Sequence, residues 1–345
     1  MSDFTTSGVR VIQLNNIGDI YFNNDNKTFV SESKANELNS CNAYPGDIIF
    51  AKMMPAGRAC VLPEIYKRYL LGSDAIRCKL DLNKCDLFFF LENINRISFR
   101  NFIASKTTGS TRKRIGLPEL RNLTLLIPEI QEQRKIGKIF SIIEEKLNVT
   151  NKIITTLKKY KRGLIQKGLK LLLKSSVQVP FINLFEEQKE RNISNFKQYT
   201  VGKDGLKKIE ETNYELSNHL VFHPNCLLVG IGIDEIAISE NITGSVSPVY
   251  KVYAIDDFKY VDYCKYYLKP LLWKRKAFIT KKSTRREFEI DINELRKMKL
   301  PACNNEEFKS LYKIIRLVDN KIDYVTHKYK FLIKLKNYLL QNLFI

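Results

Sequence analysis

The segment from residue 128 to residue 169 carries apolar side chains at alternating steps of three and four. The series begins at Ile136 and ends at Leu164, and Thr150 and Lys161 are its polar members. Apolar residues at this spacing line one face of a helix, as they do along the seam of a coiled coil. The pattern therefore predicts one long amphipathic helix whose apolar face packs against another helix.

The same pattern returns near the C-terminus at a constant offset (311 − 136 = 175). Lys161 then corresponds to Lys336, and Gln166 corresponds to Gln341. The seam positions of the second copy are Leu311, Ile315, Val318, Ile322, Val325, Tyr329, Leu332, Lys336 and Leu339. Two patterns in register, with a lysine at the same seam position, indicate a duplicated element.

The stretches ahead of both helices have the alternating and turn-rich patterns of mixed α/β domains. In the first stretch the expected strands are Val9–Leu14, Ile48–Ala51, Ile76–Leu80 and Leu123–Ile127, and the expected helix is Cys85–Ala104. In the second the expected strands are Tyr199–Val201, Cys226–Val229 and Val249–Ile255, and the expected helix is Tyr260–Phe278. The chain is therefore predicted to contain two copies of one unit, an α/β (α+β) globular domain followed by a long helix.

This duplication predicts four parts: globular domains at 1–127 and 173–300, and helical regions at 128–172 and 301–345. A single amphipathic helix cannot bury its apolar stripe alone, so its duplicate is the simplest partner. Antiparallel packing would give the chain internal pseudo-twofold symmetry, with the globular domains at opposite ends of the helices. Helices of about 35 residues are roughly 50 Å long, and one DNA turn is about 34 Å. We therefore expect the two domains to contact two half-sites on one face of a duplex.

Charge supports a polyanionic partner. The chain has 345 residues, with 57 Lys and Arg against 37 Asp and Glu, which gives a net charge of +20. A surplus of this size is typical of proteins that bind nucleic acid or an anionic surface. No apolar run approaches the ~18–20 residues of a membrane-spanning helix, and we expect no signal peptide. The seven cysteines are scattered without a C-x-x-C motif, which favours reduced thiols in a cytoplasmic protein.

Two basic loops follow the predicted helices of the globular domains at equivalent places. Ser283-Thr284-Arg285 corresponds to Ser110-Thr111-Arg112 (283 − 110 = 173). Mixed cations and hydroxyls are typical of phosphate contacts, although a solvated loop is the simpler alternative. The candidate DNA contacts in the first loop are Lys106, Thr108, Ser110, Arg112, Lys113 and Arg114, and those in the second are Lys281, Lys282, Ser283, Arg285 and Arg286.

Other side chains are candidates for base recognition. Lys52, Arg58 and Arg112 have the donors that bind guanine, and Asn15, Asn16 and Asn24 have the amide that binds adenine. Asparagine-rich segments are more often simple turns, so these three residues are the less specific candidates.

No catalytic, metal or cofactor site is predicted. Gly230-Ile231-Gly232 lacks the third glycine of a dinucleotide loop and is followed by Asp234-Glu235, which would repel phosphate. The tetrapeptide of amino-methyltransferases is absent, and the E-x-K triplets have no partnering Pro-Asp. His219 and His223 lack a third metal ligand. Trp273 and the tyrosines near residue 266 are expected in the core.

Three sequence features occur in a fixed order. Pro128 is followed by the run Glu132–Ile136, the helix ends 157–166 and 332–341 match, and the segment Pro45–Lys52 lies inside the first globular domain. In order, duplication and spacing, the chain resembles the specificity (S) subunit of type I restriction–modification systems over essentially its whole length. It departs from that pattern at Glu307-Phe308, where the first copy has Glu132-Gln133, and at 301–304, which lack a proline-plus-acidic entry.

This resemblance implies two target-recognition domains, an antiparallel coiled coil and a bipartite DNA target. It also implies two docked methylation subunits, which carry S-adenosylmethionine, and restriction subunits in the full complex. The candidate partner-binding residues are Glu132, Gln133, Ile136, Lys161, Gln166, Lys336 and Gln341. The first hypothesis is thus a non-catalytic recognition subunit that reads an asymmetric DNA site. The alternatives are a methyltransferase or nuclease acting alone, and a coiled-coil scaffold without a DNA role.

Overall fold

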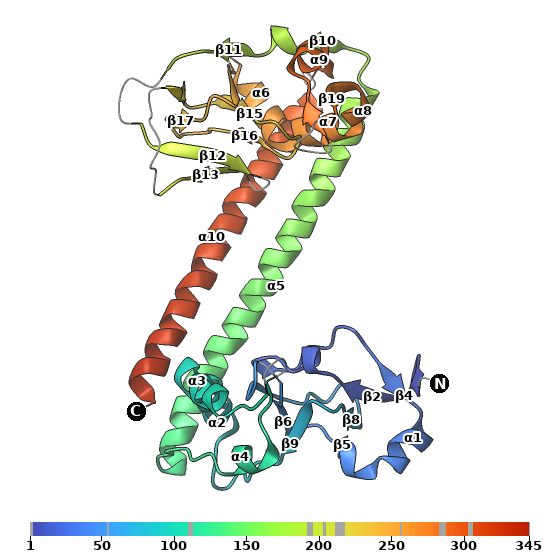
Figure 1. The fold of residues 1–345 in the computed structure, drawn as a ribbon, viewed down its shortest axis with the longest axis vertical. Helices are drawn as coiled ribbons and strands as arrows, with labels where there is room; N and C mark the ends of the chain where they lie inside the picture. Colours follow the sequence, from blue (N-terminus) through green and yellow to red (C-terminus); the bar gives the residue numbers. More distant parts are fainter. Residues whose placement is uncertain are drawn as a thin grey trace. The chain divides into compact units, whose positions relative to one another are not determined.

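The structure is a computed structural model, shown in Figure 1. It describes residues 3–53, 55–109, 113–191, 196–202, 205–210, 218–255, 257–282, 288–302 and 306–344, with residues 258 and 259 described by their backbone only. The chain divides into two compact units. Unit 1 comprises Met1–Lys152 and Thr326–Ile345, and unit 2 comprises Ile153–Val325. Each unit therefore contains one globular part and one portion of each long helix.

Two small sheets form the globular part of unit 1. The first has the order β1-β4-β2-β8-β5, in which β2 and β8 are parallel. The second has the order β3-β7-β6-β9, in which β6 lies between antiparallel β7 and β9. The strands are β1 Phe4–Thr5, β2 Val9–Ile12, β3 Ile20–Tyr21, β4 Phe29–Val30, β5 Asn42–Ala43, β6 Ile48–Ala51, β7 Ala59–Val61, β8 Tyr69–Leu71 and β9 Ala75–Cys78. The strands predicted at 9–14, 48–51 and 76–80 are confirmed, and β6 is buried along its whole length, as its apolar run predicts.

Short helices cover these sheets. They are α1 Glu32–Glu37, α2 Leu87–Asn95, α3 Ile97–Ser105 and α4 Leu117–Arg121, with 3-10 turns η1 Leu14–Asn16 and η2 Asn39–Cys41. The single helix predicted over residues 85–104 is instead two helices, because Arg96 adopts an extended backbone conformation between them. Side-chain oxygens of Ser31 and Asp86 cap the first turns of α1 and α2, satisfying otherwise unpaired amides.

The predicted strand Leu123–Ile127 is wrong, because this segment forms no strand. Its counterpart in unit 2 is β21 Lys299–Pro301, which pairs with β10 Gln178–Pro180 just after the first long helix. The corresponding N-terminal strand of unit 1, β1, pairs with β4 instead. A strand needs a neighbour to accept its backbone hydrogen bonds, and residues 123–127 do not have that neighbour.

The globular part of unit 2 shares the central strand pairings of unit 1, whereas the edge strands differ: β3 is parallel to β7 in unit 1, and β11 is antiparallel to β18 in unit 2. In the sheet β11-β18-β15-β16, strand β15 lies between antiparallel β16 and β18, as β6 lies between β7 and β9. In the sheet β13-β12-β17-β14, strands β12 and β17 are parallel, as β2 and β8 are. The strands are β11 Glu186–Gln188, β12 Gln198–Gly202, β13 Gly205–Lys208, β14 Leu220–Phe222, β15 Cys226–Val229, β16 Ile236–Ile238, β17 Gly244–Val246 and β18 Lys251–Ala254. The predicted duplication is thus confirmed at the level of the central strand pairings.

Unit 2 also contains the helical run predicted from Tyr260 to Phe278. It consists of α6 Phe258–Tyr263, a π-helical turn η5 Cys264–Leu268, α7 Lys269–Lys274 and α8 Lys276–Ile279, and further elements are η3 Phe181–Asn183 and α9 Ile292–Lys297. The tyrosines at 263, 266 and 267 lie in the core as predicted. The core placement of Trp273 is wrong, since its side chain is 45% exposed and its indole N–H donates to Asp234.

The two long helices are confirmed as α5 Ile130–Lys174 and α10 Glu306–Leu343 (Figure 1). Within unit 1, Phe140 packs on Phe344, whereas Leu147 of the same helix clusters with Leu332. Within unit 2, Lys161 pairs with Asp319 and Lys167 with Glu307. In each unit, residue numbers rise along α5 while they fall along α10, so the packing is antiparallel. No helix in the described ranges has an apolar segment long enough to cross a membrane.

Candidate nucleic-acid interface and helical docking surface

The first basic loop is a hairpin anchored to the end of β6. Thr108 and Arg114 exchange backbone hydrogen bonds of 2.9 Å, which close the loop. The next residue, Ile115, is buried, and its N–H donates to the carbonyl of Lys52 at 2.9 Å. Lys106, Thr108, Lys113 and Arg114 are all exposed, whereas Ser110 and Arg112 lie outside the described residues. The structure therefore presents several predicted DNA contacts on one anchored hairpin.

The second basic loop is anchored in the same way. It leaves β19 Thr280–Lys281 and returns through β20 Glu289–Ile290, and the two strands pair antiparallel. Ile290 is buried, and its N–H donates to the carbonyl of Ile231, two residues after β15, at 2.7 Å. Lys281 and Lys282 are exposed, and Ser283, Arg285 and Arg286 lie outside the described residues. We call the described residues within 106–114 and 280–290 the basic hairpins, and their matching anchors extend the duplication to the candidate interface.

Neighbouring groups orient two cations of the first hairpin. The guanidinium of Arg114 forms an ion pair of 2.9 Å with Asp74, and half of the Arg114 side chain remains exposed. The ammonium of Lys106 lies 5.5 Å from the ring centroid of Phe102. Exposed contacts of this kind contribute little to stability. They restrict the directions in which the two cations point.

Lys52 and Arg58 lie beside this hairpin and are partly buried. Lys52 directly follows β6, and Arg58 directly precedes β7. The backbone N–H of Lys52 donates to the carbonyl of Asp74 at 2.8 Å. The guanidinium of Arg58 reaches the carbonyl of Leu14 over a long 3.4 Å. The structure thus brings these two predicted guanine-binding residues next to the first basic hairpin.

The predicted asparagines differ in accessibility. Asn16 is fully buried: its side-chain oxygen accepts from the N–H of Gln13, and its side-chain nitrogen donates to the carbonyls of Asn23 and Asp25. Its amide is occupied by the turn, which corrects the prediction that Asn16 can bind adenine. Asn15 is exposed and Asn24 is partly exposed, so they remain candidates.

Sequence reasoning missed Arg10, whose side chain is completely buried below this turn. Its guanidinium donates to the carbonyls of Val11 and Thr28 and lies within 6 Å of two aromatic ring centroids. Burial lowers the pKa of Arg10. The sequence gives no sign that Arg10 holds this turn, because the carbonyl of Thr28, which accepts from its guanidinium, lies 18 positions away in the sequence.

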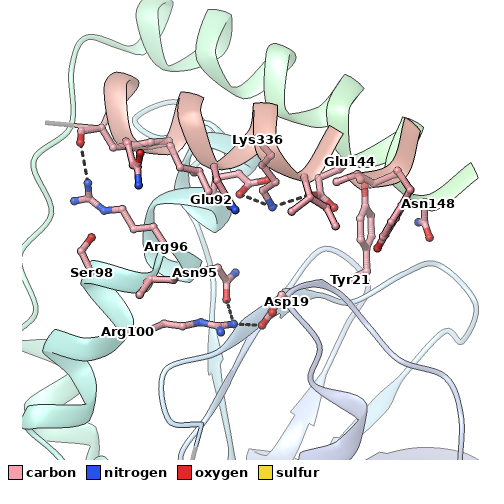
Figure 2. Close-up of a pocket in the computed structure, with 18 of the residues that line it drawn as sticks. Asp19, Tyr21, Glu92, Asn95, Arg96, Ser98, Arg100, Glu144, Asn148 and Lys336 are labelled. Atoms are coloured by element: carbon pink, nitrogen blue, oxygen red, sulfur yellow. Dashed lines mark hydrogen bonds and ion pairs between the residues drawn. The ribbon is translucent and has the colours of Figure 1, made fainter. Parts of the chain in front are cut away.

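The lysines on the helical seam form ion pairs within the chain. In unit 1, Lys336 lies 2.6 Å from Glu144 and 2.9 Å from Glu92 of α2, as Figure 2 shows. In unit 2, Lys161 pairs with Asp319, which also accepts from the hydroxyl of Tyr266 at 2.6 Å. The pairs are equivalent by the sequence offset (336 − 161 = 175 and 319 − 144 = 175). The polar seam position therefore has a structural partner in both units.

Glu92 is the most deeply buried carboxyl of this network, with 1% of its surface exposed. Burial raises the pKa of Glu92 to about 7, against the opposing effect of Lys336. The network lies at a polar cleft of about 910 Å³ within unit 1, where Arg100 also pairs with Asp19 (Figure 2). Protonation of Glu92 near neutral pH would remove a charge from the contact between α2 and the helical seam.

Four of the predicted partner-binding residues are used inside the chain. Gln133 is buried: its side chain accepts from the N–H of Asp86 and donates to the carbonyls of Lys84 and Pro128. Ile136 is buried in the seam, and the two seam lysines are in the ion pairs above. Glu132, Gln166 and Gln341 are exposed. A role of any of the seven residues in partner binding stays a prediction.

A second apolar stripe on the long helices was not predicted. In unit 1, Ile139, Ile142 and Val149 of α5 are 44%, 43% and 49% exposed. Their counterparts in unit 2 at the offset of 175 are Ile314, Leu317 and Tyr324 of α10, which are 41%, 68% and 64% exposed. We call these two sets the docking stripes. Their steps of three and seven beside the seam are visible in the sequence and would have identified them.

The described residues contain no group of three or more His, Cys, Asp or Glu side chains able to hold a metal ion. His223, considered above as a metal ligand, instead lies 3.0 Å from the carboxylate of Glu190.

Comparisons with known proteins agree with this architecture. Residues 10–159 match the family model of the type I restriction modification DNA specificity domain. The chain is 22% identical, over 166 residues, to the putative type I restriction enzyme MjaX specificity subunit of Methanocaldococcus jannaschii. That match covers 46% of this chain and 39% of the relative, so the chain spans about two fifths of the curated relative's length.

Among solved structures, the chain is similar to the S subunit of a type I restriction–modification system from M. genitalium. The TM-score is 0.65 at 18% identity, and the alignment covers 99% of this chain and 94% of that one. At this identity the likeness shows the fold.

Proposed function

We propose, from the match of residues 10–159 to the type I restriction modification DNA specificity domain, that this chain belongs to that family and is a DNA-recognition and assembly subunit without catalytic residues of its own. Each globular part contacts one half of a bipartite, asymmetric DNA site. The observation that carries this proposal is the pair of basic hairpins, which are anchored alike in two units that share their central strand pairings. Residues 1–127 and 173–300 are the proposed target-recognition domains, and residues 128–172 and 301–345 are the proposed helical regions.

The docking stripes support the partner side of the proposal. Exposed apolar side chains in a row along a helix are the kind of surface that a partner helix buries. Because equivalent stripes occur once in each unit, two copies of the same partner are expected. In this proposal the partners are methylation subunits, which supply the S-adenosylmethionine chemistry, and restriction subunits complete the enzyme. The match to this family does not favour the two alternative functions, which are a methyltransferase or nuclease acting alone and a scaffold without a DNA role.

Neutralising the basic hairpins tests the DNA interface. Replacing Lys106, Lys113, Lys281 and Lys282 by glutamine should weaken DNA binding of the chain with its partner equally for all sequences. Each lost phosphate contact is expected to reduce the slope of log K against log salt by about 1. Binding measured by fluorescence anisotropy between low and moderate salt gives that slope.

The matched control is Lys79→Gln. Lys79 is exposed and follows the end of β9 that lies away from the first basic hairpin, since Ala75, not Cys78, pairs with Ala51. An unchanged slope in the hairpin variant, or an equal change in the control, would argue against these hairpins as the interface.

A further inference from the structure

A short loop lies beside the basic hairpin in both units. In unit 1 it comprises residues 52–58, between β6 and β7, and in unit 2 residues 230–235, between β15 and β16. Both hairpins are anchored to these loops, through the carbonyls of Lys52 and Ile231. We call them exit loop 1 and exit loop 2, because each leaves the central strand of its sheet. Any DNA bound by the hairpins therefore lies close to an exit loop.

The exit loops carry opposite charges at equivalent positions. Exit loop 1 begins with Lys52 and ends with Arg58, and it has no acidic residue. Exit loop 2 has no cation and ends with Asp234 and Glu235. Arg58 directly precedes β7, just as Glu235 directly precedes β16. The carboxylate of Glu235 accepts from two backbone N–H groups of its own loop, so the neighbouring Asp234 is the carboxylate of exit loop 2 that is left for a ligand. Since the phosphate backbone is the same in both half-sites, loops that only bound phosphate would both need cations. The difference points to base edges, where donors and acceptors vary.

Adjacent helices fix the position of each loop. In unit 1, Asn95 of α2 holds both backbone groups of Ala59, the residue after Arg58, with hydrogen bonds of 3.2 and 2.9 Å. In unit 2, Asp234 accepts from Trp273 of α7 at 3.3 Å and, through its carbonyl, from Lys269 at 2.9 Å. Base recognition requires side chains held by a rigid support, and both loops have one.

The side chains of Arg58 and Asp234 can form further hydrogen bonds with a ligand. The guanidinium of Arg58 has five N–H donors, and its contact with Leu14 is long at 3.4 Å. The side chain of Asp234 is 46% exposed, and its Oδ1 pairs with the ammonium of Lys269 at 3.6 Å and accepts from Trp273. Both contacts use Oδ1, which leaves Oδ2 to accept from a ligand. A guanidinium complements the two acceptors on the guanine edge, whereas a carboxylate complements an exocyclic amino group.

We propose, building on the proposed function, that Arg58 and Asp234 are base-reading residues of opposite polarity. Arg58 donates to a guanine in one half-site. Asp234 accepts from the exocyclic amino group of a cytosine or adenine in the other half-site. The two halves of the DNA target therefore differ in the type of base read by the exit loops.

Selection from a DNA library tests this assignment. The chain, in complex with its methylation subunit, selects duplexes in which both half-sites are randomised, and the bound pool is sequenced. Arg58→Gln is expected to reduce the preference for guanine at one position of one half-site by about tenfold or more. Asp234→Asn, which keeps an oxygen for Trp273, is expected to reduce the preference for an amino-bearing base at one position of the other half-site. The base selected at that position, cytosine or adenine, shows which base donates the amino group.

Three variants separate base recognition from other effects. Arg58→Lys keeps the charge but loses the forked donors, so it should lose the guanine preference while the salt dependence is retained. Lys79→Gln and Glu240→Gln change charges at the far ends of β9 and β16 and should leave the motif intact. An unchanged motif in both test variants, or uniform weakening over all sequences, overturns the assignment. If the wild-type complex selects no sequence at all, the proposed function itself fails.

Discussion

Replacing Ile142 of unit 1 by aspartate is expected to remove one of two bound partner subunits from the complex. The side chain belongs to the docking stripe and is 43% exposed in the chain alone. A carboxylate at the centre of an apolar interface would be desolvated without a counter-charge, which costs roughly 3 kcal/mol or about a hundredfold in Kd. Leu317→Asp should remove the partner from the equivalent stripe of unit 2, and the double variant should bind none. Light scattering of the purified complex measures the number of copies.

Asn148→Asp provides the control for this series. Asn148 is exposed on the same helix but outside the stripe, where it lines the polar cleft of unit 1. It adds the same charge and should leave two partners bound. A double stripe variant that still carried two partners would show that docking uses another surface.

Replacing Lys336 by methionine is expected to cause a large loss of stability. Glu92 and Glu144 would then face each other without their shared cation, at 1% and 12% exposure of their side chains. Removing one member of a buried ion pair costs about 3–5 kcal/mol. Thermal unfolding of the chain at pH 8 measures this loss. Lys330→Met on the exposed face of α10 is the control and should change little.

The same network predicts a specific pH dependence. The pKa of Glu92 rises from 4.5 to about 7 in the folded chain. The folded state therefore binds this proton more tightly, and its contribution to stability is present below pH 4.5 and is lost as the pH rises through 7. A shift of this size corresponds to roughly 3 kcal/mol. Glu92→Gln should remove this contribution to the free energy of unfolding. Lys336→Met should reduce the free energy of unfolding by less at pH 5 than at pH 8. Equal costs at both pH values would show that Glu92 does not titrate there.

Local periodicity made the helical part of the fold predictable. The alternating three-four spacing identified α5 and α10 and their duplication. The apolar residues of a coiled-coil seam recur on consecutive turns of one helix, so the pattern is local in the sequence. Buried strands such as β6 were also predictable from their apolar runs. The strand expected at 123–127 failed because strand formation depends on a partner elsewhere in the chain.

Long-range contacts limited the prediction of the site. The carbonyl of Lys52 anchors Ile115, and Glu92 meets Lys336 across 244 positions of sequence (336 − 92 = 244), so neither contact leaves a local pattern. The sequence does not show that the side-chain amide of Asn16 forms three hydrogen bonds within its turn, so Asn16 was predicted to bind a base. The docking stripes show the opposite case, because their spacing was present in the sequence but was masked by the stronger seam pattern beside it.

The central proposal for this protein is that two related recognition domains act on one DNA target. Its most direct test is methylation-sensitive sequencing of cells that express the chain with its methylation partner. We predict a modified motif of two different specific parts separated by a spacer without sequence preference. Exchange of residues 1–127 for the equivalent part of a similar specificity subunit should change one of these parts only. A single continuous motif, or a change in both parts after the exchange, would contradict the account.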